Sequence, residues 1–324
     1  MTDPAIPDVS IVTVNYRVTD LVRGMLDSVA AATAGVTCEV VVVDNASRDE
    51  RLSALRSDYP WVKLIESPVN VGFSRGNNLG VRESRGRFLA LVNPDVLLEP
   101  ESLSRLVAFM KDLPNAGLVG PRIALPDGTT QSFAGELPTA TEFLRSLPGT
   151  RFWSGAINLR QSAVSAPMRC GFVHGACMFL SRGAFERIGG IPAETFMYGE
   201  ELLLGHRLRQ AGYDVWYDPL VTVQHAEESS ANRSFLPDDK ALRKRWGHTV
   251  ARAEILPRSS FLAWNSVMAS RALTSAVKAS LTGSAARAHH LELLRLHLSA
   301  FGTLRAPAAV IAPPVTPPPS VSSP

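Results

Sequence analysis

The chain has 324 residues, of which 45% are hydrophobic and 19% are charged, so its composition is that of a globular protein with a large core. Its three cysteines, Cys38, Cys170 and Cys177, follow no C-x-x-C spacing, which argues against a disulfide framework and a structural zinc site. The net charge of +3 hides an asymmetry, because residues 240–305 contain eleven Lys or Arg against two Glu.

The same composition limits the cellular location. No apolar run reaches the roughly 18 residues that a membrane-spanning helix needs. The segment from Met1 to Pro4 lacks the basic and apolar regions of a secretory signal. We therefore expect a cytoplasmic protein whose basic C-terminal third favours peripheral binding to the anionic inner face of the cell membrane. A single basic cluster, Arg243 to Gly247, is weak evidence for nucleic-acid binding, and we expect none.

Strand and helix patterns alternate at short spacing in the first third of the chain. Short apolar segments rich in β-branched residues predict strands at 9–15, 39–44, 61–65 and 88–92. Helical periodicity and capping residues predict helices that follow Thr19 or Asp20, Ser47 with Glu50, Ser74, and Pro100. This alternation is typical of an α/β fold with a mainly parallel sheet flanked by helices.

Three of the predicted strands end in polar residues, namely Asn15, Asp44 and the segment Asn93-Pro94-Asp95. Because the carboxyl ends of parallel strands meet at one edge of a sheet, these side chains would line a common ligand crevice. Pro94 fixes its own φ and keeps Asn93 extended, which aims the Asp95 side chain. A carboxylate held there suits Mg²⁺ or Mn²⁺ carried by a diphosphate, and the alternative is a turn Asp that caps the next helix.

The segment from Asn70 to Gly80 is rich in glycine. Its glycines would let the backbone approach a ligand closely, and the helix N-terminus could face phosphate oxygens. The segment does not match G-x-x-x-x-G-K-[ST], and no G-x-G-x-x-G follows the first strand. These absences argue against a P-loop enzyme and a dinucleotide oxidoreductase.

The middle of the chain carries a strand, a turn and a helix with paired acids. Residues 117–133 predict a strand and an Asp127-Gly128 turn, and residues 134–168 predict either a lid or a disordered insertion. Glu200 and Glu201 begin a helix that Gly212 ends. The helix dipole favours ionised acids there, as a general base requires, although simple helix-start acids are the alternative.

The last third predicts helices and a tail. The pattern of residues 259–304 predicts two helices broken near Gly283. These helices either lie at a membrane interface or pack against the domain or a second subunit. The last alternative makes a homodimer a possible assembly. We divide the chain into a catalytic domain over 1–235, a basic helical extension over 236–305, and a disordered, proline-rich tail over 306–324.

Four ordered motifs together resemble glycosyltransferase family 2, most closely its rhamnosyltransferase-like branch. They are V-S-I-V-T-V-N-Y at 9–16, V-V-V-D-N-A-S at 41–47, N-V-G-F-S-R-G-N-N-L-G at 70–80 and L-V-N-P-D-V at 91–96. The resemblance covers roughly residues 8–230 and implies the GT-A fold. It also implies an inverting transfer of a sugar, L-rhamnose being one candidate, from a dTDP- or UDP-linked donor to a saccharide or lipid-linked acceptor in cell-wall or polysaccharide synthesis.

The resemblance also assigns site residues. It implies donor contacts from Asn15, Asp44, Asn77, Asn93 and Asp95. It implies a divalent cation, Mg²⁺ or Mn²⁺, on Asp95 and His225, and an acceptor side formed by His174, Gly175 and Ala176. Glu201, beside Glu200, takes the position of the base that deprotonates the acceptor hydroxyl.

The chain departs from the family pattern at three positions. Asn93 replaces the first acid of Asp-x-Asp, Glu201 replaces an Asp, and Leu203 stands where another acid often follows. Two other functions stay open. One is a nucleotidylyltransferase, which would need a basic, glycine-rich loop after the first strand, where Tyr16 to Thr19 stands. The other is a non-catalytic sugar-nucleotide-binding protein, which the altered Glu200 to Leu203 segment allows.

Overall fold

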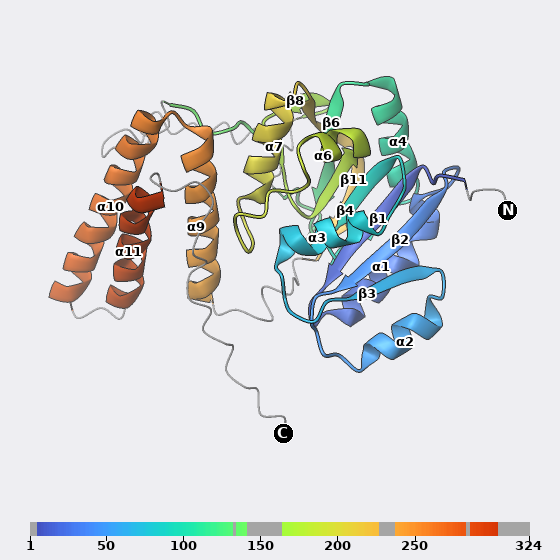
Figure 1. Ribbon diagram of the computed structural model, residues 1–324, viewed down its shortest axis with the longest axis horizontal. Helices are drawn as coiled ribbons and strands as arrows, with labels where there is room; N and C mark the ends of the chain where they lie inside the picture. The colour runs from blue at the N-terminus through green and yellow to red at the C-terminus, as the bar shows by residue number, and fades with distance from the viewer. Residues whose placement is uncertain (1–4, 132–133, 141–163, 227–236, 283–285, 304–324) are drawn as a thin grey trace. The chain divides into compact units, whose positions relative to one another are not determined.

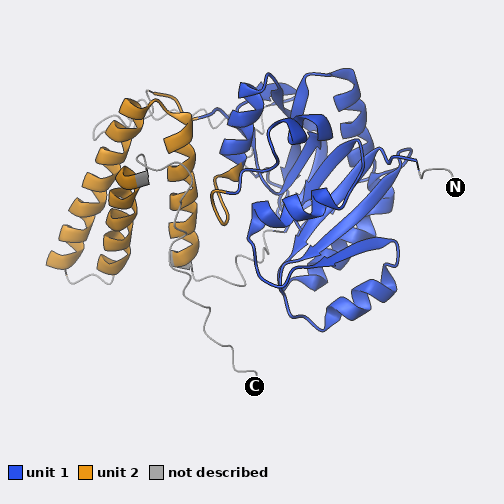
Figure 2. Ribbon diagram, in the orientation of Figure 1, with its two compact units in different colours: residues 1–137, 157–193, 201–233 blue, residues 138–156, 194–200, 234–324 orange. Residues whose placement is uncertain are grey.

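The computed structural model describes residues 5–131, 134–140, 164–226, 237–282 and 286–303 (Figure 1). The chain divides into two compact units, the first formed by 1–137, 157–193 and 201–233, and the second by 138–156, 194–200 and 234–324 (Figure 2). The second unit therefore includes the short segment 194–200 as well as the C-terminal helices. The predicted domain boundary at residue 235 and the predicted tail lie outside the described residues.

The first unit is built on a mixed sheet, in which nine strands pair among the described residues. Along the sheet the order is β3 (Val62–Glu66), β2 (Cys38–Asp44), β1 (Val9–Asn15), β4 (Phe88–Val92), β10 (Cys177–Ser181), β6 (Ala116–Ala124), β11 (Asp214–His225) and β5 (Val96–Leu98), and β8 (Met168–Cys170) pairs with β11. A small separate ladder joins β7 (Ala134–Gly135) to β9 (Phe172–Val173).

Strand direction decides which residues share an edge. β1 pairs in parallel with β2 and β4, and β2 pairs in parallel with β3. β10 is antiparallel to both β4 and β6, and β11 is parallel to β6, so β6 and β11 run in the same direction as β1. The carboxyl ends of β1, β2, β4, β6 and β11 consequently lie at one edge of the sheet.

Alternate residues of the central strands pack on opposite faces, as the pleat of a strand requires. Val40 and Val42 belong to the core shared with α1 (Thr19–Ala32) and α4 (Ser102–Asp112). Val41 and Val43 belong to the core shared with α3 (Phe73–Arg82), α6 (Arg182–Arg187) and α7 (Glu200–Gln210). The sheet is thus buried on both faces, and α2 (Arg51–Asp58) lies beside α1 (Figure 1).

The C-terminal helices of the second unit are α9 (Pro237–Ile255), α10 (Arg258–Leu281) and α11 (Arg287–Thr303). Leu256, Phe261 and Trp264 are among the residues of their own small core. Among the described helices, none has the length and apolar character needed to cross a bilayer. The predicted break near Gly283 falls at 283–285, outside the described residues.

A buried polar pair joins α10 to α11. Asn265 is fully buried and His297 is 2% exposed. The Asn265 Nδ2 group donates to the His297 carbonyl oxygen at 2.8 Å, and the His297 Nδ1 atom lies 2.8 Å from Asn265 Oδ1. Because Oδ1 can only accept, Nδ1 of His297 carries a proton in this arrangement. The pair fixes the register of the two helices.

Several details differ from the sequence prediction because side chains that were expected to cap helices make tertiary contacts instead. Val18 precedes α1 without a side-chain cap, and Thr19 instead donates its hydroxyl to Asp49. The predicted Ser47 and Glu50 capping box is wrong, since α2 has no side-chain cap and Ser47 Oγ accepts from the Arg17 amide. The short strand β5 was not predicted, because its three residues give no periodicity.

Two glycines of the 70–80 segment have a packing role that the sequence did not predict, and the ligand approach of this segment stays a prediction. A Cβ on Gly76 would lie 3.0 Å from Val14 Cγ1, and one on Gly80 would lie 2.4 Å from Val12 Cγ1. Both glycines therefore let α3 lie close on the sheet. Gly72, with a φ of 84°, provides the left-handed turn that precedes the helix.

We predict that Gly80→Ala destabilises the protein, although alanine is the better helix former by about 1 kcal/mol. The new methyl group has to displace Val12 or part the helix from the sheet. Gly24→Ala in α1 is the matched control, because its Cβ would make an ordinary 3.5 Å contact with Leu97 Cδ2. Urea unfolding should give Gly80→Ala a smaller free energy of unfolding than wild type, and Gly24→Ala an equal or larger one. An equal gain in this free energy in both variants would contradict the close packing of α3 on the sheet.

We also predict that the helices of the second unit lose stability as the pH falls from about 6.5 to about 4. Burial first, and neighbouring arginines second, lower the pKa of His297 and of His248 to about 4. The unfolded chain binds these protons near pH 6.5, so acid favours unfolding throughout that interval. The free energy of unfolding, measured with urea at several pH values in this interval, should change less with pH in His297→Gln than in wild type. Glutamine keeps hydrogen-bonding groups but does not titrate. An equal pH dependence in the two proteins would be inconsistent with a neutral, buried His297.

Candidate active site

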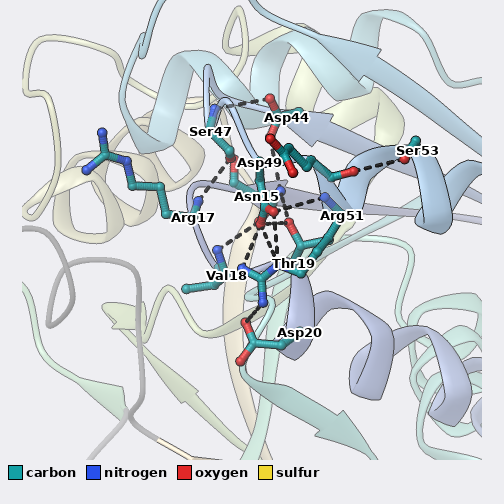
Figure 3. Close-up of polar contacts among 11 residues, drawn as sticks. Asn15, Arg17, Val18, Thr19, Asp20, Asp44, Ser47, Asp49, Arg51 and Ser53 are labelled. Carbon is teal, nitrogen blue, oxygen red and sulfur yellow. Dashed lines mark hydrogen bonds and ion pairs between the residues drawn. The ribbon is translucent and has the colours of Figure 1, made fainter. Parts of the chain in front are cut away.

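The first group of site residues is a hydrogen-bonded cluster at the ends of β1 and β2, here called the Asn15–Asp44 cluster (Figure 3). The Asn15 Nδ2 group donates to Asp44 Oδ1 and to Thr19 Oγ1, both at 3.0 Å. The Ser47 amide donates to Asp44 Oδ2 at 3.1 Å. Thr19 donates onward to Asp49 Oδ2 at 2.7 Å, so the cluster links both strand ends to the loop before α2.

The two acids of this cluster differ electrostatically. Asp44 is 3% exposed, and burial raises the pKa of its carboxyl above the ordinary value, against the hydrogen bonds from Ser47 and Asn15 that lower it. The Arg51 guanidinium binds Asp49 at 2.7 Å and holds the pKa of that carboxyl at about 2. Asp49 is therefore already paired with a cation within the loop, whereas Asp44 accepts hydrogen bonds from the neutral groups of Asn15 and Ser47.

A cavity of about 560 Å³ opens beside this cluster. Such a volume lies in the range of small-ligand sites. Its wall is formed by the end of β2, the loop that follows, α2 and the end of β3; the residues are Asp44, Ala46, Arg48, Asp49, Glu50, Leu52, Ser53, Arg56, Glu66, Ser67 and Pro68. Ala46 and Arg48 adopt left-handed φ angles of 63° and 53°, which shape this wall.

The second group is the Asp95–His225 pair, at the ends of β4 and β11. The Asp95 side chain is fully buried and that of His225 is 6% exposed, and His225 Nε2 lies 3.3 Å from Asp95 Oδ2. Among the described residues, neither Asp95 oxygen nor His225 Nε2 has a hydrogen-bond partner. Buried polar atoms without partners are costly, and oxygen with imidazole nitrogen is a donor set that suits a divalent cation. The pair therefore fits a metal ion.

The predicted acceptor-side residues adjoin this pair. The Asn93 amide donates to the Ala176 carbonyl oxygen at 2.8 Å, and the Ala176 amide donates to His174 Nδ1 at 3.1 Å. The His174 and His225 rings lie 6.2 Å apart. The turn at His174 and Gly175 separates β9 from β10, and the Ala176 carbonyl oxygen that follows it accepts from Asn93.

Both groups lie at the same edge. In the parallel register Val12 of β1 is level with Leu91 of β4, and Asn15 is level with Asp44. Past Val92 the chain leaves β4 in a turn, in which the Val96 amide donates to the Asn93 carbonyl oxygen at 3.1 Å, and Asp95 lies in this turn. Because β1 and β4 are neighbouring parallel strands, the Asn15–Asp44 cluster and the Asp95–His225 pair lie at the same edge of the sheet. The structure therefore pairs Asn15 with Asp44 and Asp95 with His225, and it places these residues and Asn93 at one edge of the sheet.

The paired acids begin α7, as predicted from the sequence. Leu204 and Leu208 pack α7 onto the sheet, and a Cβ on Gly205 would lie 2.1 Å from the Gly171 carbonyl oxygen. Gly212, with a φ of 87°, turns the chain from α7 directly into β11. The helix therefore runs antiparallel to β11, and its N-terminus points toward the edge where His225 lies. Glu200 is 6% exposed, whereas Glu201 is only partly buried.

Some residues were missed or are placed differently. Asn77 is 2% exposed and donates to the Phe73 carbonyl oxygen within α3, so its donor contact stays a prediction. Arg48 and Arg56 line the cavity because the local chain conformation brings them there. They belong to no sequence motif, so the sequence did not indicate them. Gln131 contacts His225 and lay within a segment to which the sequence assigned only a strand and a turn.

Two glycosyltransferases are similar in sequence to this chain. An N-acetylglucosaminyl-diphospho-decaprenol L-rhamnosyltransferase of Mycobacterium tuberculosis is 29% identical over 238 residues, which are 69% of this chain and 77% of the relative. A low-salt glycan biosynthesis hexosyltransferase of Haloferax volcanii is 27% identical over 234 residues, covering 70% of this chain and 69% of the relative.

A solved structure confirms the fold. The mannosyltransferase of Pyrobaculum calidifontis, in complex with GDP-mannose and Mn²⁺, superposes with a TM-score of 0.53 at 17% identity over 93% of this chain and 88% of the other. This likeness supports the predicted GT-A fold. The model of "Glycosyl transferase family 2" matches residues 10–189, which is more than half of the sequence. The chain therefore belongs to glycosyltransferase family 2.

Proposed function

We propose that this glycosyltransferase moves a sugar from a nucleoside-diphosphate donor to a hydroxyl group in one inverting displacement. The observation that carries the proposal is that the Asn15–Asp44 cluster and the Asp95–His225 pair both lie at the carboxyl-end edge of the sheet. The first would bind the nucleoside part and the second the diphosphate. Family membership argues against the nucleotidylyltransferase alternative.

The donor end of the site has the features of a nucleoside pocket. The cavity of about 560 Å³ contains Asp44 and Glu66, whose carboxylates can accept hydrogen bonds from base or ribose. Arg48 in the same wall supplies positive charge toward phosphate, whereas Arg56 is paired with Glu66 Oε1 at 2.8 Å. We propose a dTDP- or UDP-linked donor, and L-rhamnose as its sugar on the strength of the Mycobacterium tuberculosis relative.

Asp95 and His225 would hold the divalent cation, and Mn²⁺ suits an imidazole ligand better than Mg²⁺ does. A cation bound there supplies charge neutralisation for the diphosphate that leaves. Among the described residues, no group of three or more His, Cys, Asp or Glu side chains converges as a metal cage. The two protein ligands would then leave coordination positions open for phosphate oxygens, as in a site that binds metal and donor together.

Glu201 would act as the general base. In the displacement, the acceptor oxygen forms a bond to the anomeric carbon while the bond from that carbon to the diphosphate oxygen breaks. The proton of the acceptor hydroxyl goes to the Glu201 carboxylate, and the electron pair leaves with the nucleoside diphosphate. Partial exposure makes Glu201 the better candidate than the buried Glu200. Holding both reactants in line provides the rest of the rate enhancement.

We propose a saccharide or lipid-linked acceptor, in cell-wall or polysaccharide synthesis, by analogy with the decaprenol-linked acceptor in the name of the mycobacterial relative. The α10 surface supports a peripheral membrane contact. Leu273, Val277 and Leu281 follow each other at four-residue spacing and are 50%, 50% and 83% exposed. Exposed Arg271 and Lys278 flank them, as expected of a helix that meets anionic lipid. A homodimer stays a prediction.

The base assignment predicts that Glu201→Gln lowers kcat by about 10² to 10⁴-fold with the dissociation constant of the donor nearly unchanged, since the amide cannot take a proton. Glu200→Gln is the matched control and should keep more of the activity. The measurements are sugar transfer and nucleotide binding on the same preparations. Unchanged transfer in Glu201→Gln would overturn the assignment, and absence of transfer in wild type despite donor binding would favour the non-catalytic alternative.

The membrane contact predicts that a triple variant, Leu273→Ser with Val277→Ser and Leu281→Ser, loses sedimentation with vesicles that contain phosphatidylglycerol. Leu220→Ser in β11 is the control, because Leu220 is 61% exposed but lies in the first unit. Wild type should sediment with these vesicles and not with pure phosphatidylcholine. Equal sedimentation of the triple variant would rule out α10 as the contact.

A further inference from the structure

We propose that Gln131 is a positioning residue that fixes the tautomer of His225 and thereby turns the lone pair of His225 Nε2 toward Asp95. The inference deepens the proposed function, because it rests on a metal role for the Asp95–His225 pair. The contact that carries it is the 2.8 Å approach of Gln131 Oε1 to His225 Nδ1.

The atoms that face each other in this contact assign a proton to His225 Nδ1. An amide oxygen has lone pairs and no hydrogen, so Gln131 Oε1 can only accept, and His225 Nδ1 must carry the proton. A neutral imidazole protonated at Nδ1 has its remaining lone pair on Nε2. That atom lies 3.3 Å from Asp95 Oδ2 and has no hydrogen-bond partner in the part of the chain that the structure describes. Two electron-rich atoms then face each other in a buried place, which is the arrangement that a cation stabilises.

Gln131 is held in place by the hairpin that follows β6. The Leu125 amide donates to the Thr129 carbonyl oxygen at 2.8 Å, and Ala124 bridges to Thr130. The Gln131 amide donates to the Ile123 carbonyl oxygen at 3.0 Å, which anchors the residue to β6. β6 pairs in parallel with β11 up to Ala124 and Gln224, so the returning hairpin brings Gln131 beside the end of β11.

The contact is specific to a long side chain with an acceptor. Leucine at 131 keeps a similar volume but offers His225 no acceptor, so both tautomers of His225 become accessible. Glutamate at 131 also accepts from Nδ1 and should preserve the tautomer. Outer partners of this kind typically change metal affinity by about 10 to 100-fold when they are removed.

The neighbouring strand residue provides a matched control. Gln224 precedes His225, and its amide group donates to Glu99 Oε1 instead of contacting the imidazole. Gln224→Leu therefore makes the same chemical change one residue away from His225. If general damage to the end of β11 were the cause of an effect, this variant would show it as well.

The test is ¹⁵N NMR of the metal-free full-length protein labelled at histidine, at a pH about two units above the ordinary imidazole pKa. The chain has seven histidines, so the spectrum of His225→Gln identifies the His225 signals. Wild type, Gln131→Glu and Gln224→Leu should show protonated Nδ1 and unprotonated Nε2. Gln131→Leu should show a mixture of tautomers.

Titration of Mn²⁺ into the same samples gives the second measurement. Gln131→Leu should bind Mn²⁺ about 10 to 100-fold more weakly than wild type, and Gln131→Glu should recover the affinity. A His225 spectrum that is the same in wild type and Gln131→Leu, or protonated Nε2 in wild type, overturns the inference. If the tautomer depends on Gln131 while wild type binds no Mn²⁺, the metal role fails and the positioning role of Gln131 stands.

Discussion

The parallel run of β1, β4, β6 and β11 is the constraint on which the site depends. Asp95 and His225 lie far apart in the sequence, and they come within 3.3 Å because their strands end at the same sheet edge. β10 makes this arrangement work, since its antiparallel pairing with both β4 and β6 lets the second half of the sheet point the same way as the first. The short strand β5, paired with His225 through Val96, joins the segment after Asp95 directly to β11.

Burial gives that edge its chemical character. A carboxylate that is removed from water without hydrogen bonds is destabilised, and the Asp95 side chain is fully buried. The Asn15–Asp44 cluster next to it has the opposite character, because its polar atoms are paired with Thr19, Ser47 and each other. The polar side chains at the ends of β1 and β2 are therefore paired by hydrogen bonds, whereas the Asp95 carboxylate after β4 suits a positively charged partner. The proposed ligand, a nucleoside diphosphate with a divalent cation, has a polar nucleoside for the first group and a charged end for the second.

The sequence predicted the elements with strong local signals, including β1, β2, β4 and α7 and the polar strand ends. Those signals are apolar runs closed by a polar residue, and parallel strands make their consequence simple. Features that depend on distant contacts were missed. The Gly80 position is set by Val12, the Gln131 contact by the return of a hairpin, and the membership of segment 194–200 in the second unit by its contact with α9. A Cβ on Gly247 of α9 would lie 1.9 Å from the Tyr198 carbonyl oxygen. No sequence pattern near Gly199 predicts this close contact between the segment and α9.

The central claim is that the cluster and the pair bind one ligand with one cation. Calorimetric titration of dTDP and UDP with and without Mn²⁺ tests this most directly, in wild type and in Asp95→Asn, with Asp127→Asn in the exposed hairpin turn as the control. The account predicts that Mn²⁺ and the nucleotide strengthen each other's binding in wild type and in Asp127→Asn, and that this coupling is lost in Asp95→Asn. Nucleotide affinity in wild type that is the same with and without Mn²⁺ would contradict it.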